Sequence, residues 1–353
     1  MAAGKLTALQ VLRAFAALSV VFHHALRAVS VHAPGDLAAS SPLIIPAAVV
    51  ELGAFGVDLF FVLSGFLMIF ISRKYVSGEK PVSDFLIQRI FRVWPLYVIA
   101  TALYLGLAIV SSLTKTGELP YDTAWWRLLS IFFIPSFDRT GVLQPIVGVG
   151  WTLNYEAFFY LVFSIALFFP GRFILPAVGG VLFAFFLAGC YVLPSGSAGH
   201  IFLSNPILFE FLFGAVIAAM HRGGFLRLNA LYYLSAGFAL LIAFAFVPNE
   251  SVWRFIARGV PAALIFIGFL RLEERVTWSR LLVLLGDASY SIYLFHVVIL
   301  YQVIGKLFPL IAKALPVLSG EVSALMASLV AIVIGTLIHL FVEKPILGFL
   351  GKR

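Results

Sequence analysis

Apolar residues run through this chain in long stretches, and most polar residues lie between them. A window of about 20 apolar residues can cross the ~30 Å hydrocarbon layer of a bilayer as a helix, which rises about 1.5 Å per residue. The pattern predicts ten transmembrane helices, near residues 7–29, 52–72, 93–113, 151–169, 173–193, 204–221, 230–247, 253–270, 283–305 and 322–342. We therefore expect an all-α integral membrane protein.

One further apolar stretch, residues 127–137, is too short to cross a bilayer and contains Pro135. A crossing at this point would also invert every later loop. Lipid cannot satisfy the hydrogen bonds of irregular backbone, so this stretch is expected to be a re-entrant or interfacial segment packed against protein.

The composition agrees with a membrane protein, because 62% of the residues are apolar, 11% are charged and the mean hydropathy is +1.06. Soluble domains are about 45–50% apolar and about 25% charged. Repeats and linkers are not evident, so residues 1–353 are expected to form a single membrane domain, without a cleaved signal peptide or a soluble extracellular domain. The single cysteine, Cys190, excludes a disulfide framework and a cysteine-based metal site, and we expect no metal.

The net charge of +8 bears on orientation and partners. If the first helix begins in the cytoplasm, most basic residues fall in cytoplasmic loops, and the positive-inside rule then predicts that both chain termini are cytoplasmic. Basic residues scattered among apolar spans suit anionic lipid headgroups. The bilayer is therefore an expected partner and nucleic acid is not.

Ionisable residues inside the predicted spans indicate function, since a charge at the bilayer centre costs roughly 2.5–3.5 kcal/mol. Arg13 and His24 both lie in the first span. Eleven residues at about 100° each bring them within about 20° of the same helical face, and about 16 Å apart along the axis. His23 points about 100° away and is expected to be a packing or interfacial residue.

The expected topology brings other polar residues to the depth of His24, in the outer half of the membrane. These are Asp58, Glu156 with its neighbours Asn154 and Tyr155, and His296. A neutral histidine beside a carboxylate can remove a proton from a hydroxyl group.

Arginines are expected at the opposite, cytoplasmic side, namely Arg13, Arg89 and Arg92. Guanidinium groups bind phosphates in bidentate fashion. The two sets of residues together predict group transfer from a cytoplasmic, phosphate-bearing donor to a hydroxyl at the outer side.

The same residues lie in ordered blocks that resemble the acyltransferase 3 family of membrane O-acyltransferases. The blocks are LQVLRAFAALSVVFHHA with Arg13 and His24, GVDLFFVLSGFLM with Asp58, FLIQRIFRVWPLY with Arg89 and Arg92, WTLNYEAFFY with Glu156, SYSIYLFH with His296, and FVEKP with Glu343. The first block is most similar to exopolysaccharide acetyltransferases of the succinoglycan type. Gln88 departs from the family pattern, in which some members carry an additional arginine in the third block.

The resemblance implies an enzyme of the bacterial inner membrane that uses acetyl-CoA or another acyl-CoA as co-substrate and has no permanently bound cofactor. The implied acceptor is a hydroxyl of a cell-envelope or exported polysaccharide, or of its lipid-linked precursor. His24 would be the catalytic base, assisted by Asp58 or Glu156. Arg13, Arg89 and Arg92 would bind the donor, and Asn154, Tyr155 and His296 would lie on the acceptor side.

Other interpretations of the same residues remain open. Intramembrane His, Asp and Glu also build proton relays, so a proton-coupled transporter or a flippase for a glycan or acyl species is the main alternative, and a subunit without chemistry is a third. Gly53, Gly56 and Gly65 are expected to permit close helix packing. Ser64 is expected to bond to its own backbone, as a serine in an apolar helix often does.

Overall fold

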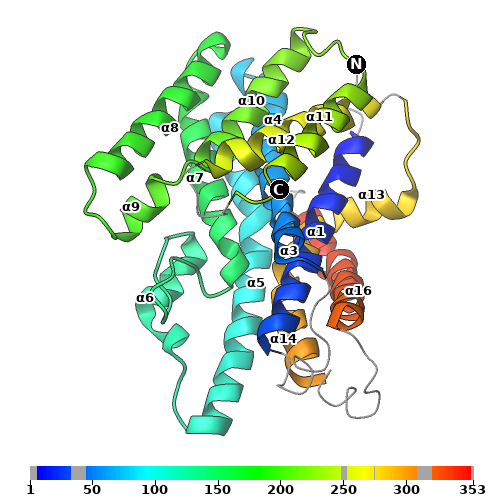
Figure 1. The fold of residues 1–353 in the computed structure, drawn as a ribbon. Coiled ribbons are helices and arrows are strands. Elements are labelled where there is room, and N and C mark those ends of the chain that lie inside the picture. The colour runs from blue at the N-terminus through cyan, green and yellow to red at the C-terminus, as the bar shows by residue number, and fades with distance from the viewer. Residues whose placement is uncertain (1–5, 33–44, 248–252, 274, 308–319, 351–353) are drawn as a thin grey trace. The chain divides into compact units, whose positions relative to one another are not determined.

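The computed structural model describes residues 6–32, 45–247, 253–273, 275–307 and 320–350, and these are almost entirely helical (Figure 1). Within the described residues the only β-pairing is an isolated bridge between Phe137 and Leu143. The predicted all-α class is confirmed. Residues 1–5 and 351–353, the two chain ends, lie outside the described residues. The predicted cytoplasmic location of both ends therefore falls on residues that the structure does not describe.

Seven described helices are long and apolar enough to cross a membrane. They are Thr7–Ser30, Ala47–Val76, Val82–Thr116, Gly171–Tyr191, Ala198–Arg222, Phe255–Leu272 and Gly320–Leu350. The pair Arg280–Asp287 and Ser289–Gly305, bent by 69°, gives an eighth candidate if it forms one broken span. The helices at two other predicted spans, Trp151–Ala166 and Ala230–Ala243, contain 16 and 14 residues, and are shorter than the ~30 Å hydrocarbon layer. Ten crossings therefore remain a prediction.

The chain forms two compact units, with the boundary inside helix α4 (Gly56–Val76), between Phe60 and Phe61. Unit 1 comprises residues 1–60 and 227–345, and unit 2 comprises residues 61–226 and 346–353. The longer helices of unit 1 are α1 (Thr7–His32), α11 (Ala230–Ala243), α12 (Val260–Leu272), α13 (Arg280–Asp287), α14 (Ser289–Gln302) and α16 (Gly320–Ile338). Those of unit 2 are α5 (Val82–Thr116), α7 (Trp151–Ala166), α8 (Ile174–Tyr191) and α10 (Leu208–Arg222).

Helix α1 is the centre of unit 1, where it packs against α12, α13, α14 and α16. Small apolar residues let these helices approach closely, and Ala17, Val21 and Ala25 of α1 belong to the buried core with Ile292 of α14. The Glu273 carboxylate accepts hydrogen bonds from the backbone N–H groups of Thr7 and Ala8, at 2.7 Å each. It thereby satisfies free donors at the positive end of the α1 dipole.

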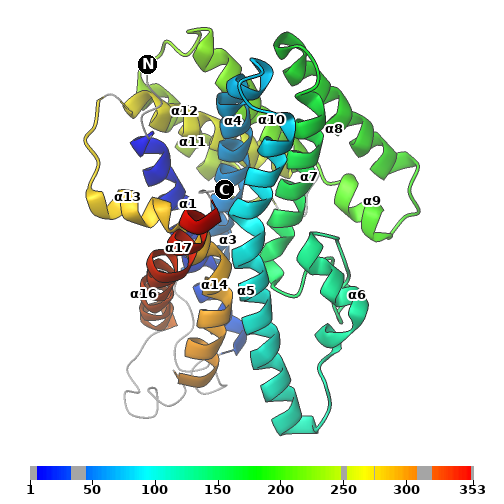
Figure 2. The ribbon, with the colours of Figure 1, turned by 180° about the vertical axis from the view of Figure 1, so that it is seen from behind.

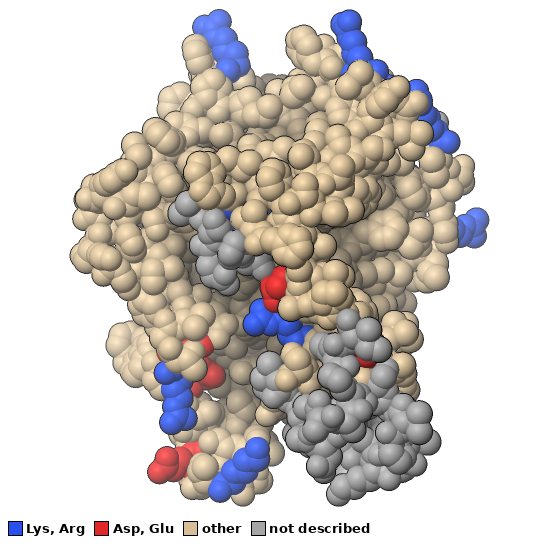
Figure 3. All heavy atoms as spheres, in the orientation of Figure 1, with Lys and Arg blue, Asp and Glu red and all other residues tan. Residues whose placement is uncertain are grey.

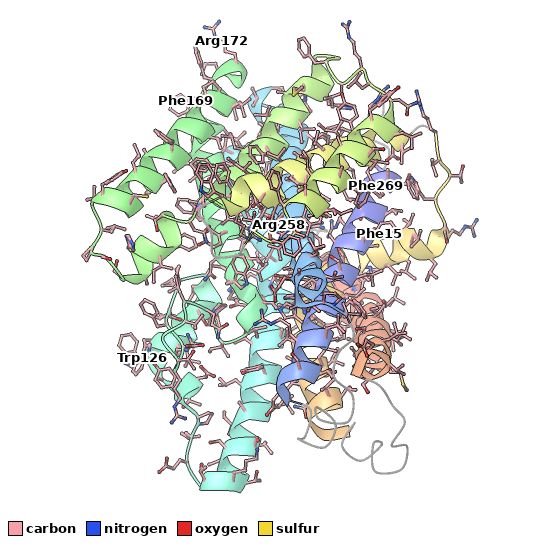
Figure 4. All side chains as sticks on the ribbon, in the orientation of Figure 1. Phe15, Trp126, Phe169, Arg172, Arg258 and Phe269 are labelled. Carbon is pink, nitrogen blue, oxygen red and sulfur yellow. The ribbon has the colours of Figure 1, made fainter. Side chains whose placement is uncertain are left out.

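In Figure 4, Phe15 of α1 and Phe269 of α12 lie side by side, in an edge-to-face contact of 6.0 Å. The end of α12, at Glu273, contacts the start of α1, and Phe269 contacts Phe15 further along α1. The two helices are therefore antiparallel. In the space-filling view most visible atoms belong to neither acidic nor basic residues, as expected for a chain solvated by lipid (Figure 3).

Unit 2 is built around α5, which is seen from behind in Figure 2 with α7 beside it. Pro81 precedes the helix and Gly117, at φ 73°, ends it in a left-handed cap. Phe85 lies against Phe163 with ring centroids 5.4 Å apart, and Tyr97 packs closely on Gly150, so α7 runs antiparallel along the first half of α5.

The segment between α5 and α7 contains no helix long enough to cross a membrane, in agreement with the prediction for residues 127–137. Its helical parts are the short turns Tyr121–Thr123, Trp125–Leu128, Leu129–Phe132 and Gly148–Gly150. Buried Arg127 holds it together by donating hydrogen bonds to the backbone oxygens of Phe137 and Gln144, at 3.0 and 2.8 Å. Trp94 of α5 donates to the backbone oxygen of Ile131 at 3.0 Å, which fixes the segment on unit 2.

The three glycines singled out in the sequence do permit close packing. A Cβ on Gly53 would lie 2.7 Å from the Cβ of His23, and one on Gly56 would lie 2.1 Å from the backbone oxygen of Ala16, both in unit 1. A Cβ on Gly65, in unit 2, would lie 1.8 Å from the backbone oxygen of Phe211. Such approaches exclude any side chain at these positions.

Candidate functional site

His24 lies in α1 against His296 of α14, both in unit 1. The His24 Nδ1 atom is 3.0 Å from the backbone oxygen of Val20 and 3.1 Å from the Nε2 atom of His296. The His296 Nδ1 atom is 2.6 Å from the backbone oxygen of Tyr293, and the His296 side chain is fully buried.

These contacts define which ring nitrogens carry hydrogen. Carbonyl oxygens only accept hydrogen bonds, so Nδ1 is protonated in both rings and Nε2 of neutral His296 is an acceptor. The His24 Nδ1–H group is then shared between Val20 and His296. The lone pair on His24 Nε2 is left available, which is the arrangement a general base requires.

His23 faces another way, as the helical period predicts. Its Nδ1 atom bonds the backbone oxygen of Val50 at 2.7 Å, and its Cβ packs against Gly53. It is a packing residue in unit 1.

Arg13 lies on the same face of α1 as His24, because its partner is also on α14. The Arg13 side chain is buried, and its Nε atom donates to the Ser289 hydroxyl at 3.1 Å. Ser289 and His296 are seven residues apart on α14, and therefore lie two helical turns apart on one face. The predicted shared face of Arg13 and His24 is confirmed.

Asp58 has a partner that the sequence analysis did not single out. Its fully buried carboxylate forms an ion pair with Arg254, at 2.9 Å from Nη1 and 3.1 Å from Nη2. Arg258 (labelled in Figure 4), one turn further along and only 1% exposed, donates to the backbone oxygens of Ala245 and Val247 at 3.3 and 3.4 Å.

Arg254 and Arg258 resembled ordinary loop residues because they lie at the edge of a predicted span. Their spacing of four residues puts both on one face of a helix that enters the membrane, and this spacing could have indicated a buried role for them.

Glu343 belongs to a polar cluster at the start of α14. The Ser291 hydroxyl donates to the Glu343 carboxylate at 2.6 Å, and the His339 Nδ1 atom contacts the same oxygen at 2.8 Å. Glu343 thus joins the last long helix to α14 within unit 1.

In unit 2, Glu156 is bonded by two hydroxyl groups. Ser64 donates to its Oε1 atom at 3.2 Å, and Tyr160 donates to the same oxygen. The expectation that Ser64 bonds to its own backbone is therefore wrong, because a carboxylate from the facing helix is within reach of the hydroxyl.

Glu156 and Arg89 line one cavity of about 610 Å³ in unit 2. Asn154 and Tyr160 also contribute to its walls, whereas Arg92 does not. Arg89 and Glu156 were expected at different membrane depths, and this expectation is wrong. Helix α7 packs along the first half of α5, which carries Arg89, so that residues near the start of α7 line the cavity with Arg89.

Tyr155 points away from Glu156 and stacks on Phe202, with ring centroids 4.3 Å apart. It is buried, as is Asn154. Among the described residues, no group of three or more His, Cys, Asp or Glu side chains is arranged to hold a metal ion.

Comparison with known proteins agrees with the family resemblance of the sequence blocks around Arg13, Asp58, Glu156 and His296. A family model described as an acyltransferase domain matches residues 6–341. The exopolysaccharide production protein ExoZ of Rhizobium meliloti (strain 1021) is 34% identical over 305 residues, covering 84% of this chain and 90% of ExoZ. Acyltransferase MdmB of Streptomyces mycarofaciens is 27% identical, covering 86% of this chain and 84% of MdmB.

A third relative is YrhL of Bacillus subtilis (strain 168), which is named as a candidate peptidoglycan O-acetyltransferase. It is 26% identical over 337 residues, which cover 83% of this chain and 50% of YrhL. No solved structure matches the chain.

Proposed function

Because the chain belongs to the acyltransferase 3 family and is therefore an acyltransferase, we propose that it moves an acetyl group from acetyl-CoA to a polysaccharide hydroxyl. The acceptor is a cell-envelope or exported polysaccharide, or its lipid-linked precursor. The names of the relatives ExoZ and YrhL support a polysaccharide acceptor, and the name of YrhL supports acetyl as the transferred group. The observation that carries the proposal is the His24–His296 pair, which leaves a histidine lone pair available inside an apolar bundle.

In this mechanism His24 Nε2 accepts the proton of the acceptor hydroxyl as its oxygen attacks the thioester carbonyl carbon. The bond from that carbon to sulfur breaks, and the imidazolium returns the proton to the leaving thiolate. His296 holds the Nδ1–H group of His24 and stabilises the imidazolium by accepting a charge-assisted hydrogen bond. It takes the role that the sequence had suggested for a carboxylate.

The remaining site residues are given supporting roles. Arg13 and Arg92 are proposed to attract the donor phosphates, with Arg13 positioned by Ser289. Asp58 positions Arg254, and Glu156 positions Ser64 and Tyr160. Arg89 is proposed to join these donor residues, from the wall of the cavity that Glu156 also lines.

The proposed membrane topology has ten crossings. Helices α1 and α14 run parallel, because Arg13 contacts Ser289 and His24 contacts His296. If both cross, an odd number of crossings must separate them. Five long apolar spans lie between them in sequence, so the shorter helices α7 and α11 either both cross or both do not. We propose that both cross, in the bacterial cytoplasmic membrane.

The geometry of unit 1 also supports cytoplasmic chain ends. The first half of α1 and the end of the last long helix both reach the start of α14, through Arg13 with Ser289 and through Glu343 with Ser291. These contacts favour the same side of the membrane for the start of α1 and the end of the last long helix. The positive-inside rule favours the cytoplasm as that side.

The test is acetyl transfer by the purified full-length chain in lipid nanodiscs, supplied with acetyl-CoA labelled in the acetyl group and a polysaccharide acceptor. Label is expected on the polysaccharide with the wild type and not with His24→Ala. In sealed liposomes, movement of the glycan or of label across the bilayer without covalent transfer would instead establish a transporter and overturn the proposal.

A further inference from the structure

A second cavity of unit 2, of about 660 Å³, lies where three helix ends meet. The C-terminal parts of α4 and α10 and the start of α8 contribute to its wall. Three of the wall residues are arginines, one from each end, namely Arg73 from α4, Arg172 from the turn before α8, and Arg222 from α10. All three are exposed, so a ligand in the cavity can reach them.

The charge of this cavity is strongly positive. No acidic residue contributes to the described wall, and Arg73 repels Arg222. Glu79 contacts the wall from outside, where its exposed carboxylate accepts a hydrogen bond from the Ser77 hydroxyl at 2.7 Å. One carboxylate beside three guanidinium groups leaves an excess of positive charge, so an anion in the cavity would relieve the repulsion.

Two of the arginines are held in place by other contacts. The Arg222 Nη2 atom donates to the backbone oxygens of Ile69 and Phe70, at 2.5 and 3.1 Å. The Arg172 guanidinium lies 4.7 Å from the centre of the Phe173 ring, and in Figure 4 its side chain extends past the end of α8. Side chains that are already ordered lose less conformational entropy when a ligand binds.

The cavity lies at the depth of lipid headgroups, because each arginine is at the end of a candidate membrane span. These spans are Ala47–Val76, Gly171–Tyr191 and Ala198–Arg222. Since the three ends line one cavity, they lie at one surface of the membrane. The positive-inside rule favours the cytoplasmic surface.

The rest of the wall favours a lipid over a nucleotide. Apart from two serines and a glycine it is apolar, with Ile69, Val76, Ile174, Leu175, Pro176 and Ala219. Val76 is 39% exposed, and Pro176 and Ala219 are exposed as well, so the apolar part of the wall continues onto the surface that faces lipid. The described wall offers no aromatic side chain on which an adenine ring could stack.

We propose that this cavity binds one anionic phospholipid of the cytoplasmic leaflet, through a phosphate diester without a balancing amine. The three arginines donate to its phosphate oxygens, and the first carbons of its acyl chains lie against Val76 and Ala219. Basic pockets between membrane helices on this side commonly bind such headgroups. The inference goes beyond the proposed function, since this lipid takes no part in acetyl transfer and instead holds the three helix ends together.

The test is native mass spectrometry of the purified full-length chain, titrated with tetraoleoyl cardiolipin, dioleoylphosphatidylglycerol or dioleoylphosphatidylethanolamine. We expect one cardiolipin or one phosphatidylglycerol to be retained per chain, at least tenfold more tightly than phosphatidylethanolamine. Arg73→Gln/Arg172→Gln should weaken retention of both anionic lipids at least tenfold. Arg222 is left in place because it also bonds the backbone of α4.

The matched control is Lys74→Gln, which removes the same charge from the same end of α4 but not from the cavity wall. It should change retention less than twofold. The melting temperature in detergent gives a second measurement, because a ligand that binds only the folded protein raises it. Cardiolipin should raise the melting temperature of the wild type and of Lys74→Gln, but not that of the double variant.

Three outcomes would overturn the proposal. Retention of phosphatidylethanolamine as tight as that of cardiolipin would reveal an annular lipid only. The same loss in Lys74→Gln as in the double variant would reveal attraction by diffuse surface charge. Displacement of cardiolipin by coenzyme A, with coenzyme A binding lost in the double variant, would assign the cavity to the donor. Because binding is measured without acetyl transfer, a wild type that retains cardiolipin but transfers no acetyl group would contradict only the proposed function.

Discussion

The Nε2 atom of His296 lies 3.1 Å from the Nδ1 atom of His24, across the contact of α14 with α1. Both rings have their tautomer set by a backbone carbonyl, Val20 for His24 and Tyr293 for His296. The base proposed for acetyl transfer is therefore oriented by a second histidine. A neutral histidine partner adds no charge to an apolar bundle, whereas a carboxylate would have to be desolvated there.

Replacing His296 tests this orientation. His296→Leu should lower kcat for acetyl transfer by about 10²- to 10⁴-fold, the range of general base catalysis, with little change in the KM for acetyl-CoA. His296→Gln should recover part of the activity, because its amide oxygen can accept the His24 Nδ1–H bond. The kcat and KM are measured on the purified enzyme in nanodiscs.

The matched control is His23→Gln, since His23 packs in unit 1 through Val50 and has no proposed catalytic role. Equal losses in His23→Gln and His296→Leu would show that either change merely disturbs packing. Full activity in His296→Leu would rule out the positioning role.

The ion pair of Asp58 with Arg254 should be a large determinant of stability, because the carboxylate is fully buried. Asp58→Leu removes one partner of a buried ion pair, and such a removal costs about 3–5 kcal/mol. The double variant Asp58→Leu/Arg254→Leu should be more stable than Asp58→Leu alone. Thermal unfolding in detergent measures each variant, and strictly additive losses would contradict the coupling.

Close packing at Gly65 makes a second stability prediction. Gly65→Ala places a Cβ 1.8 Å from the backbone oxygen of Phe211, so helices α4 and α10 must separate and the melting temperature should fall. The matched control is Gly106→Ala in α5, where no atom lies within 4 Å of the new Cβ. That variant should be neutral or stabilising by up to about 1 kcal/mol, through helix propensity. Equal melting temperatures for the two variants would contradict the packing of α4 on α10.

The loop at Asp138, outside the spans, should respond to acid. Burial alone would raise the pKa of Asp138, but hydrogen bonds outweigh it and hold the pKa below its ordinary value of 3.8. Thr140 donates through its backbone N–H and its hydroxyl, at 2.7 Å each, and the Val142 N–H donates at 3.0 Å. A lowered folded-state pKa means that the stabilisation is fully present above the unfolded pKa, and is lost as the pH falls through the folded one.

Hydrogen exchange at the amides of Thr140 and Val142 measures this effect. The open-state population is expected to be constant near neutral pH and to grow as the pH falls below about 4. Asp138→Asn should raise exchange at neutral pH and remove the acid dependence. Unchanged protection at Val142 in that variant would contradict the role of the carboxylate.

The sequence by itself determined the properties that depend on one helix at a time. The length of apolar runs predicted the membrane helices, and the helical period put Arg13 and His24 on one face, away from His23. The ordered blocks indicated the family. The short stretch at 127–137 was predicted to lack a spanning helix, and it contains only short helical turns, because length and Pro135 decide this locally.

Only the tertiary structure decided which helices meet and how far each slides along its neighbour. Helix α5 contains 35 residues and extends well beyond α7, which packs along its first half. That offset brings Arg89 to Glu156, and it could not be derived from hydropathy. The partner of His24 and the pairing of Asp58 with Arg254 depend in the same way on contacts between distant helices. These contacts depend on steric fit at positions such as Gly56 and Gly65. The local sequence does not show which backbone segment packs against each glycine.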